Sequence, residues 1–254
     1  MNSLKGVVFD LDGVITDTAK FHFEAWSQLA KEKFDLTLPA EFESKLKGIS
    51  RIESLERILE FGNLSDKYTS DQVAEMANEK NTYYVAAIDS QLTENDILPG
   101  VKRLLDELKE NGMKLAIASA SKNAPHILEK LGIIDEFDAI ADPAKVAKGK
   151  PAPDIFIAGA EAINLDPKDC VGVEDAVAGV AAIKSAGMVA VAVGDKDELS
   201  QADEVVPSTQ DFSYELFNHA AALLYLIASG KTGFDAAASG FAPRPPPTSS
   251  SSIR

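Results

Sequence analysis

Cysteine, long apolar runs and basic residues are all scarce in this 254-residue sequence, and each shortage excludes a class of protein. Cys170 is the single cysteine, which excludes a disulfide framework and favours a cytosolic location. No apolar stretch reaches the about 18 residues that a membrane span requires. The residues after Met1 lack the apolar region of a signal peptide. We therefore expect a cytoplasmic protein with no membrane partner.

The charge balance is acidic, with 40 acidic against 25 basic residues and a formal net charge of -15 at pH 7. No basic stripe stands out, which argues against nucleic acid as a partner. A phosphorylated small molecule stays compatible with this balance, because a few lysine and arginine side chains can form a positive pocket on an acidic protein. Hydrophobic residues make up 45% of the chain, enough for a proper core.

Short apolar runs alternate with segments of helical periodicity along most of the chain. The predicted strands are residues 6–10, 114–119, 138–141, 170–173 and 189–193. Strands of continuous apolar residues that alternate with helices imply a parallel sheet covered on both faces. We therefore predict an α/β fold with a Rossmann-like parallel sheet core, whose functional residues lie at the carboxyl ends of the strands.

Residues 16–96 break this alternation, because they show helical patterns only. The simplest interpretation is a helical cap inserted between the first strand and the rest of a core formed by residues 1–15 and 97–228. Residues 229–254 are rich in Gly, Ala, Pro and Ser. Such a composition cannot bury enough apolar surface to order itself, so we expect a disordered tail and assign it no function.

Asp10 and Asp12 follow the first apolar run, and Gly13 is predicted to end that strand. Side chains two apart on a strand share one face, so both carboxylates can point into the same small volume. Neighbouring acids push each other's pKa values apart, so one can be a metal-bound nucleophile and the other a proton carrier. An Asx turn at the end of a strand is the alternative interpretation.

Two further strand ends carry polar groups. Ser119 ends the second predicted strand, and the residues after it are Ala120, Ser121, Lys122 and Asn123. These small or polar donors could clamp an anion, and they could equally serve as the N-cap of the helix that follows.

Lys150 and the acidic pair Glu174–Asp175 complete the candidate set. Pro151 keeps Lys150 out of helical geometry, which lets its side chain extend toward a site, although a Lys-Pro pair is also usual in surface loops. Glu174 and Asp175 follow the fourth predicted strand and precede a helix, where acids also complement a helix N-terminus without further function.

Together, the Asp-x-Asp start, the strand-ending Ser, the Lys before Pro and the later acidic pair resemble the haloacid dehalogenase superfamily over about residues 5–206. The resemblance implies that Asp10 is a nucleophile that forms an aspartyl phosphate, and that Asp12 is the general acid and base. It further implies that Lys150 binds phosphate, that Ser119 donates to it, and that one Mg²⁺ per site is held by Asp10, Asp12 through its backbone carbonyl, Glu174 and Asp175.

A narrower resemblance concerns the cap. Four features together are similar to the β-phosphoglucomutases of that superfamily. They are Asp-Leu-Asp-Gly-Val-Ile-Thr-Asp-Thr, His22, Lys-Gly-Ile-Ser-Arg and Ser-Ala-Ser-Lys-Asn. By this resemblance Arg51 grips the phosphate that is not being transferred, with residues 120–123 on the core side. Gly48 and Ile49 lie along the sugar.

Thr18, His22, Trp26 and Lys80 are the remaining substrate-binding candidates in the cap. The resemblance implies that His22 and Lys80 help to position the general acid. A lone histidine on a helix is more often structural, and Trp26 suits the cap's own core.

The activity implied by the resemblance is the interconversion of β-D-glucose 1-phosphate and glucose 6-phosphate by a monomer, with glucose 1,6-bisphosphate as intermediate and primer. Three alternatives stay open from the residues. They are a sugar-phosphate phosphatase, a mutase for another sugar phosphate, and a sensor that binds sugar phosphate without turnover.

Overall fold

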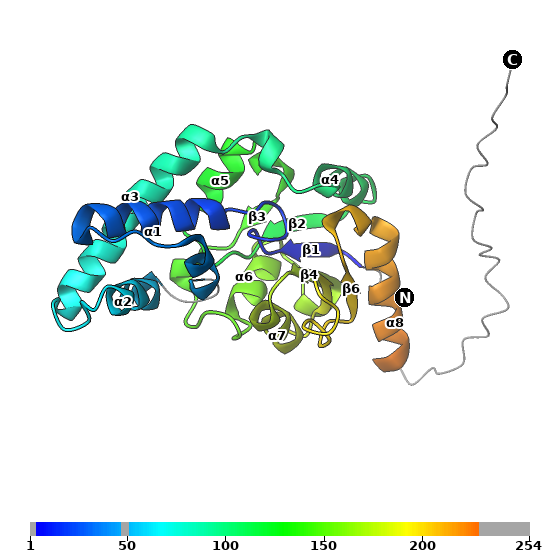
Figure 1. Ribbon diagram of the computed structural model, residues 1–254. Coiled ribbons are helices and arrows are strands. Elements are labelled where there is room, and N and C mark those ends of the chain that lie inside the picture. The colour runs from blue at the N-terminus through cyan, green and yellow to red at the C-terminus, as the bar shows by residue number, and fades with distance from the viewer. Residues whose placement is uncertain (1–3, 47–50, 229–254) are drawn as a thin grey trace, which may run out of the picture.

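The computed structural model of the chain describes residues 4–46 and 51–228. These residues contain a six-stranded parallel sheet with the strand order β3-β2-β1-β4-β5-β6 (Figure 1). The strands are β1 (Gly6–Phe9), β2 (Lys114–Ile117), β3 (Ala139–Ile140), β4 (Cys170–Glu174), β5 (Val189–Val193) and β6 (Glu204–Val206). The predicted α/β fold with a parallel sheet is confirmed.

The two faces of the sheet bury side chains of different size, because successive residues of a strand point to opposite faces. On one face Val7, Phe9 and other large side chains pack against helices α4 (Val101–Glu110), α5 (Ala124–Lys130) and α8 (Tyr214–Ala228). On the other face Val8 and several alanines pack against α6 (Asp154–Ala162) and α7 (Val177–Ser185).

Glycines allow the second face to pack closely. A Cβ atom on Gly172 of β4 would lie 2.6 Å from Cγ1 of Ile183 in α7. A Cβ atom on Gly159 of α6 would lie 2.6 Å from Cγ1 of Val8 in β1. The sequence of small residues on this face therefore sets how near α6 and α7 lie to the sheet, and it fixes the strand ends that carry the polar residues.

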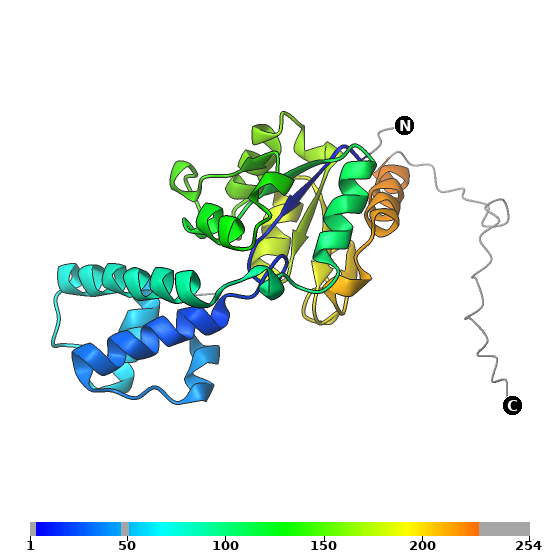
Figure 2. The same cartoon turned by 90° about the horizontal axis from the view of Figure 1, so that it is seen from above.

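The cap stands to one side of the sheet (Figure 2). It contains α1 (Ala19–Phe34), the 3-10 helix η1 (Ala40–Lys45), α2 (Arg51–Phe61) and α3 (Ser70–Gln91). Apolar side chains from all four elements form a separate cluster. Trp26 lies in this cluster, 3% exposed, in agreement with the core position that its ring favours.

Two neighbouring chain segments join the cap to the core. Thr16 forms a β-bridge with Ile97, and its hydroxyl donates to the carbonyl of Asp96 at 2.8 Å. The amide of Leu98 donates to the carbonyl of Ile15 at 2.9 Å. The segment that leaves the core and the segment that returns to it therefore lie side by side. The domain bounds at residues 15–16 and 96–97 stay a prediction.

Some boundaries differ from the prediction. Strand β1 ends at Phe9 because the chain then turns, with the amides of Ile15 and Thr16 both donating to the carbonyl of Leu11. Strand β6 was not predicted, because it is only three residues long, lies at a sheet edge and begins with a glutamate. The predicted tail, residues 229–254, lies outside the described residues. Among the described helices, none is both long and apolar enough to cross a membrane.

Candidate active site

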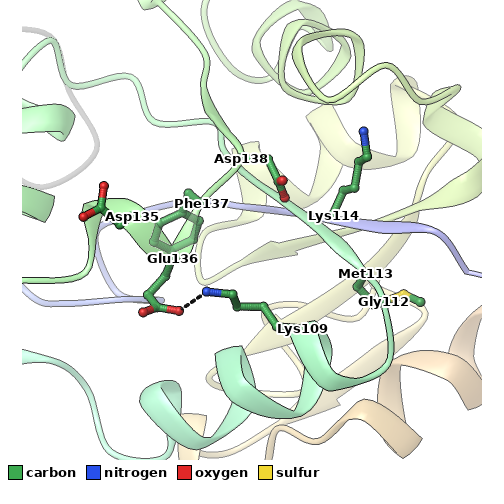
Figure 3. A pocket seen from close by; sticks show the side chains of 8 residues that line it. All are labelled: Lys109, Gly112, Met113, Lys114, Asp135, Glu136, Phe137 and Asp138. Carbon is green, nitrogen blue, oxygen red and sulfur yellow. Dashed lines mark hydrogen bonds and ion pairs between the residues drawn. The ribbon is translucent and has the colours of Figure 1, made fainter.

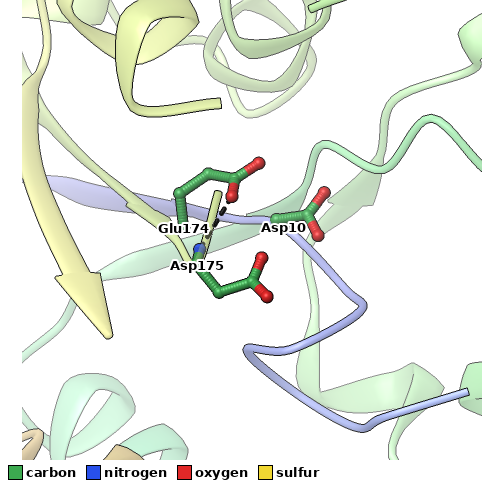
Figure 4. Close-up of side chains that lie close together, drawn as sticks. All are labelled: Asp10, Glu174 and Asp175. Atoms are coloured by element: carbon green, nitrogen blue, oxygen red, sulfur yellow. Dashed lines mark hydrogen bonds between the residues drawn. The ribbon is translucent and has the colours of Figure 1, made fainter. Parts of the chain in front are cut away.

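Three carboxyl groups meet at the carboxyl ends of the central strands β1 and β4 (Figure 4). Asp10 follows β1, Glu174 ends β4 and Asp175 comes next. Each offers a carboxylate oxygen, and these oxygens lie within 4.8 Å of one another. Because β1 and β4 are adjacent and parallel, with Phe9 opposite Val173, the register of the sheet itself brings Asp10 beside the acidic pair.

Two glycines make room for this acid cluster. Gly13 has φ +79°, a conformation that favours glycine, and a Cβ atom there would lie 2.0 Å from Oδ2 of Asp175. Gly179 lies against Glu174, whose Oε1 would be 1.8 Å from a Cβ atom. Glu174 folds back onto the start of α7, where its Oε2 accepts from the amides of Asp175 and Ala176, both at 2.7 Å. The local backbone thus fixes the direction of both acids.

Lys150 is the cation of the cluster. Its Nζ donates to Oδ1 of Asp10 at 2.5 Å and to Oε1 of Glu174 at 2.7 Å. The side chains of Lys150 and Glu174 are only 13% and 2% exposed. Burial alone would lower the pKa of Lys150, but the two carboxylates outweigh it and raise that pKa. Lys150 therefore stays an ammonium group held between two acids.

The cluster holds more negative charge than one lysine neutralises. Burial raises the pKa of Asp10 to about 7, although the ammonium of Lys150 opposes this rise. Burial, with the charges of Glu174 and Asp10, raises the pKa of Asp175 to about 8. Carboxylate oxygens are hard donors that suit Mg²⁺, and a cation among three carboxyl groups within 4.8 Å would offset their mutual repulsion, so the residues present fit the predicted cation. The Mg²⁺ site predicted at Asp10, Glu174 and Asp175 therefore has its donors together.

Asp12 turns to the start of the cap. Its Oδ1 accepts from the amide of Thr18 at 3.2 Å and from the Thr18 hydroxyl at 2.5 Å. The hydroxyl of Tyr84 in α3 donates to Thr18 Oγ1 at 3.0 Å. Burial raises the pKa of Asp12, while the bonds from Thr18 act to lower it. The carboxyl of Asp12 is thus positioned through residues of both core and cap.

Next to Tyr84 lies a buried pair of basic side chains. Nζ of Lys80 lies 2.6 Å from Nδ1 of His22 and 5.1 Å from the ring centre of Trp26. The ring of His22 stacks on Tyr84 with centroids 4.0 Å apart. Burial, reinforced by the charge of Lys80, lowers the pKa of His22 to about 3, so that His22 is neutral and accepts from Lys80. Burial lowers the pKa of Lys80 to about 7.

The loop after β2 carries the predicted anion clamp. Ser119 is 3% exposed, and its Oγ accepts from the amide of Ser121 at 3.1 Å. The hydroxyl of Ser121 accepts in turn from the amide of Asn123 at 3.2 Å. Ala120 and Lys122 are exposed in the same loop. No side-chain cap bond comes from Asn123 at the start of α5, so the alternative of a side-chain N-cap is not realised at that residue.

Arg51 lies at the start of α2 on the other side of the site. Its Nη2 donates to Oδ1 of Asn81 at 3.3 Å, and its Nη1 donates to Oδ1 of Asn78 at 3.4 Å. Nδ2 of Asn123 donates to the same Asn81 oxygen at 3.0 Å. One side-chain carbonyl of α3 therefore joins Arg51 of the cap to Asn123 of the core. Gly48 and Ile49, predicted to lie along the sugar, fall outside the described residues.

Two residues of this site were missing from the sequence analysis. Tyr84 and Asn81 both lie on α3, where Asn81 directly follows Lys80 and Tyr84 comes three residues after Asn81. The spacing of Tyr84 from Lys80 and Asn81, four and three residues, indicates a shared helix face, but nothing local shows that this face turns to the core.

A separate hollow of about 350 Å³ lies at the amino ends of β2 and β3, away from the acid cluster (Figure 3). Its polar groups bond to one another or to backbone. Nζ of Lys109 donates to Glu136 at 2.6 Å, and Oδ2 of Asp138 accepts from the amide of Leu115 at 2.8 Å. This hollow offers no group comparable to Asp10 or Lys150 for chemistry.

Comparisons with known proteins bear on the same site. Residues 4–187 match the haloacid dehalogenase-like hydrolase family. The chain is 51% identical over 215 residues to the β-phosphoglucomutase of Bacillus subtilis (strain 168), covering 85% of this chain and 94% of that protein. It is 29% identical over 187 residues to the phosphorylated carbohydrates phosphatase of Thermotoga maritima, covering 73% and 82%. Among solved structures, a β-phosphoglucomutase from Clostridium difficile matches with a TM-score of 0.78 and 46% identity, covering 88% of this chain and 99% of that one.

Proposed function

The chain belongs to the haloacid dehalogenase-like hydrolase family, and on that premise we propose that it interconverts β-D-glucose 1-phosphate and glucose 6-phosphate. The observation that carries this proposal is the presence of two sets of phosphate donors. Lys150 and Ser119 serve the acid cluster, while Arg51 and Asn123 meet on Asn81 between cap and core. A mutase must hold two phosphates at once, whereas a simple phosphatase needs one such set.

Asp10 is the nucleophile of this proposal. Its carboxylate oxygen attacks phosphorus, a new O–P bond forms, and the bond from phosphorus to the sugar oxygen breaks. Lys150 neutralises charge on the carboxylate and on the transferring group, since it lies within hydrogen-bond distance of Asp10. Ser119 donates to the oxygens that the phosphoryl group carries.

Asp12 gives a proton to the leaving sugar oxygen and takes one from the attacking sugar hydroxyl in the reverse step. Its raised pKa suits this exchange, because the carboxyl must be neutral to donate and charged to accept. The hydroxyl of Thr18 donates a hydrogen bond to the carboxyl of Asp12, and the hydroxyl of Tyr84 donates one to Thr18. His22 and Lys80 support this arrangement from within the cap.

Mg²⁺ would be held by Asp10, Glu174, Asp175 and the backbone carbonyl of Asp12, and it would neutralise charge on the phosphoryl group. Lys150 shares that task from its own position between Asp10 and Glu174.

The reaction passes through β-glucose 1,6-bisphosphate, which also primes Asp10 as its phosphate. The bisphosphate turns over between two half-reactions, so each phosphate occupies the Asp10 site and the Arg51 site in turn. Arg51 suits the second site because its planar fork binds two phosphate oxygens at once. Residues 120–123 complete this site on the core side, and Thr18, His22, Gly48, Ile49 and Lys80 are assigned to the sugar and its approach. Trp26, predicted for the same task, lies in the core of the cap and supports Lys80 from there.

The cap, residues 16–96, excludes water from the phosphorylated Asp10 when it closes over the core formed by residues 1–15 and 97–228. Exclusion of water slows hydrolysis of the aspartyl phosphate, which is the side reaction that a mutase must suppress. We propose that the chain acts as a monomer, because the cap and the core of one chain supply both sides of the site.

The test is a coupled assay for glucose 6-phosphate from β-glucose 1-phosphate, with Mg²⁺ and a trace of glucose 1,6-bisphosphate, in which free phosphate is followed in the same tube. The proposal expects glucose 6-phosphate to accumulate with little free phosphate, and it expects the α anomer to fail. Free phosphate rising alone would make the protein a sugar-phosphate phosphatase, the activity in the name of the Thermotoga maritima relative.

A further inference from the structure

Asn81 occupies a position that no role above explains. Its Oδ1 accepts from a guanidinium nitrogen of Arg51 at 3.3 Å and from the side-chain amide of Asn123 at 3.0 Å. These are two of the donors that the proposed function assigns to the second phosphate. The Asn81 oxygen therefore receives, from cap and core together, the hydrogen bonds that a phosphate oxygen would receive.

The hydrogen bonds from Arg51 and Asn123 to Asn81 are 3.3 and 3.0 Å long, and their acceptor, the side-chain carbonyl of Asn81, carries no charge. A guanidinium and a phosphate carry opposite charges and form paired hydrogen bonds of about 2.7–2.9 Å, so a phosphate outcompetes a neutral amide oxygen for Arg51. Arg51 is exposed, and its second contact, to Asn78, is longer still at 3.4 Å. Nothing in these contacts would hold Arg51 against an incoming phosphate.

We propose that Asn81 is a positioning residue whose side-chain carbonyl stands in for a phosphate oxygen, keeping Arg51 and Asn123 together until the sugar phosphate displaces it. The inference rests on the proposed function, since it concerns the second phosphate of that reaction. Without Asn81 the long Arg51 side chain would sample more rotamers, and binding would have to order it. The benefit of Asn81 therefore lies in affinity for the second phosphate and not in phosphoryl transfer.

Three variants test the proposal: Asn81→Ala, Asn81→Asp and, as the matched control, Asn78→Ala. Asn78 also accepts from Arg51 but has no contact with Asn123 among the described hydrogen bonds. Two quantities are measured for each: the Kd of glucose 6-phosphate by calorimetry, and the rate at which acetyl phosphate phosphorylates Asp10. Acetyl phosphate has no second phosphate, so its rate reports the core site alone.

Loss of one neutral hydrogen-bonding group should weaken glucose 6-phosphate binding by about three- to tenfold in Asn81→Ala. The acetyl phosphate rate should stay at the wild-type value, and Asn78→Ala should change Kd by less than about twofold. Asn81→Asp should bind more weakly than Asn81→Ala, because a carboxylate holds Arg51 as an ion pair and repels the phosphate. If Asn81 served only a structural role, the acceptor oxygen that Asn81→Asp retains would restore glucose 6-phosphate binding relative to Asn81→Ala. If phosphate must displace the acceptor, Asn81→Asp binds more weakly than Asn81→Ala.

The proposal is overturned if Asn81→Asp binds glucose 6-phosphate as tightly as wild type or more tightly than Asn81→Ala. It is also overturned if Asn81→Ala slows phosphorylation by acetyl phosphate as much as it weakens sugar-phosphate binding. Wild-type protein that binds no glucose 6-phosphate would instead contradict the proposed function itself. Wild-type binding with unchanged variants would remove the Asn81 inference and leave the proposed function standing.

Discussion

Lys150 and Arg51, the two cations that the proposed function assigns to phosphate, lie in opposite surroundings. The Lys150 side chain is 13% exposed and contacts Asp10 and Glu174 at 2.5 and 2.7 Å. Arg51 is exposed and contacts the neutral amides of Asn81 and Asn78 at 3.3 and 3.4 Å. The core site is held in place by charge before any substrate arrives, whereas the cap site depends on weak contacts that a ligand can replace.

The difference suits the two tasks. In the proposed mechanism Asp10 presents the same oxygen to phosphorus in every half-reaction, which requires rigid and preorganised surroundings. The second site must release one phosphate and accept another as the bisphosphate turns over. A site built from exposed Arg51 and neutral amides loses little when its ligand leaves. The predictions below each challenge one side of this comparison.

The largest effect is expected for Lys150→Met. It leaves the buried carboxylates of Asp10 and Glu174 without a cation, which should cost about 3–5 kcal/mol of unfolding free energy in EDTA. Activity should fall by about 10²–10³-fold, as for loss of one electrostatic group at a transition state. The measurements are chemical denaturation and the coupled assay.

The matched control is Lys168→Met. Lys168 contacts Asp166 at the same 2.7 Å that separates Lys150 from Glu174, but its side chain is 65% exposed. Such a surface pair is screened by solvent, so its loss should leave the unfolding free energy almost unchanged. Equal losses for the two variants would contradict the claim that burial makes the core cluster different.

A smaller effect is expected for Arg51→Ala. Loss of its charge-assisted contact to the second phosphate should cost about 1.5–3 kcal/mol in kcat/KM for β-glucose 1-phosphate. Phosphorylation by acetyl phosphate should be almost unchanged. Arg51→Lys keeps the charge but loses the planar fork, so it should recover only part of the loss. The same loss with both phosphoryl donors would show that Arg51 does not contact the second phosphate.

The third prediction concerns His22, whose pKa is about 3 in the folded protein because of burial and the charge of Lys80. The unfolded chain binds a proton near pH 6.5 that the folded protein does not, so unfolding free energy falls as pH falls. Between pH 7 and 5 this contribution should amount to about 2 kcal/mol. In chemical denaturation, the unfolding free energy of His22→Asn and His22→Gln should fall less between pH 7 and 5 than that of wild type. Parallel curves would mean that His22 is not held neutral.

The smallest effect is expected at a contact between cap and core outside the site. Nε2 of His126 in α5 lies 2.8 Å from Oδ1 of Asp89 in α3, and both side chains are partly or largely exposed, 36% and 53%. His126→Ala should lower unfolding free energy by about 0.2–1 kcal/mol. Asp89→Asn should do the same, and neither should change kcat. A loss of unfolding free energy close to that of Lys150→Met would show that this exposed contact stabilises the protein as much as the buried one does.

The core of the molecule could be predicted from the sequence because its signals are local. Continuous apolar runs predicted the parallel sheet, and acids directly after two of those runs predicted a cluster at the carboxyl ends. The motif starting at Asp10 also predicted the family, which the comparisons confirm. Strand ends were less accurate, since the turn after Phe9 depends on the hydrogen bonds of Leu11, which no pattern shows.

The cap could be predicted only in outline. Helical periodicity identified its helices, and Trp26 lies in their core. Ile52 shares the helical spacing of the buried Leu55 and Leu59 but is itself 39% exposed, so periodicity alone does not mark the limits of the buried face. The roles of Tyr84 and Asn81 depend on how α3 lies against the core, and that placement is set by contacts between residues far apart in sequence. Asn81 and Asn123 are 42 residues apart in the sequence, and no local pattern joins them.

The most direct test of the account is to locate the phosphoryl group on the enzyme. Wild type, Asp10→Asn and Lys168→Met are mixed with glucose 1,6-bisphosphate and Mg²⁺, quenched in acid, and analysed by peptide mass spectrometry. The account predicts one phosphoryl group on the peptide that contains Asp10 in wild type and Lys168→Met, and none in Asp10→Asn. A phosphoryl group on another peptide, or near-normal turnover of Asp10→Asn, would contradict it.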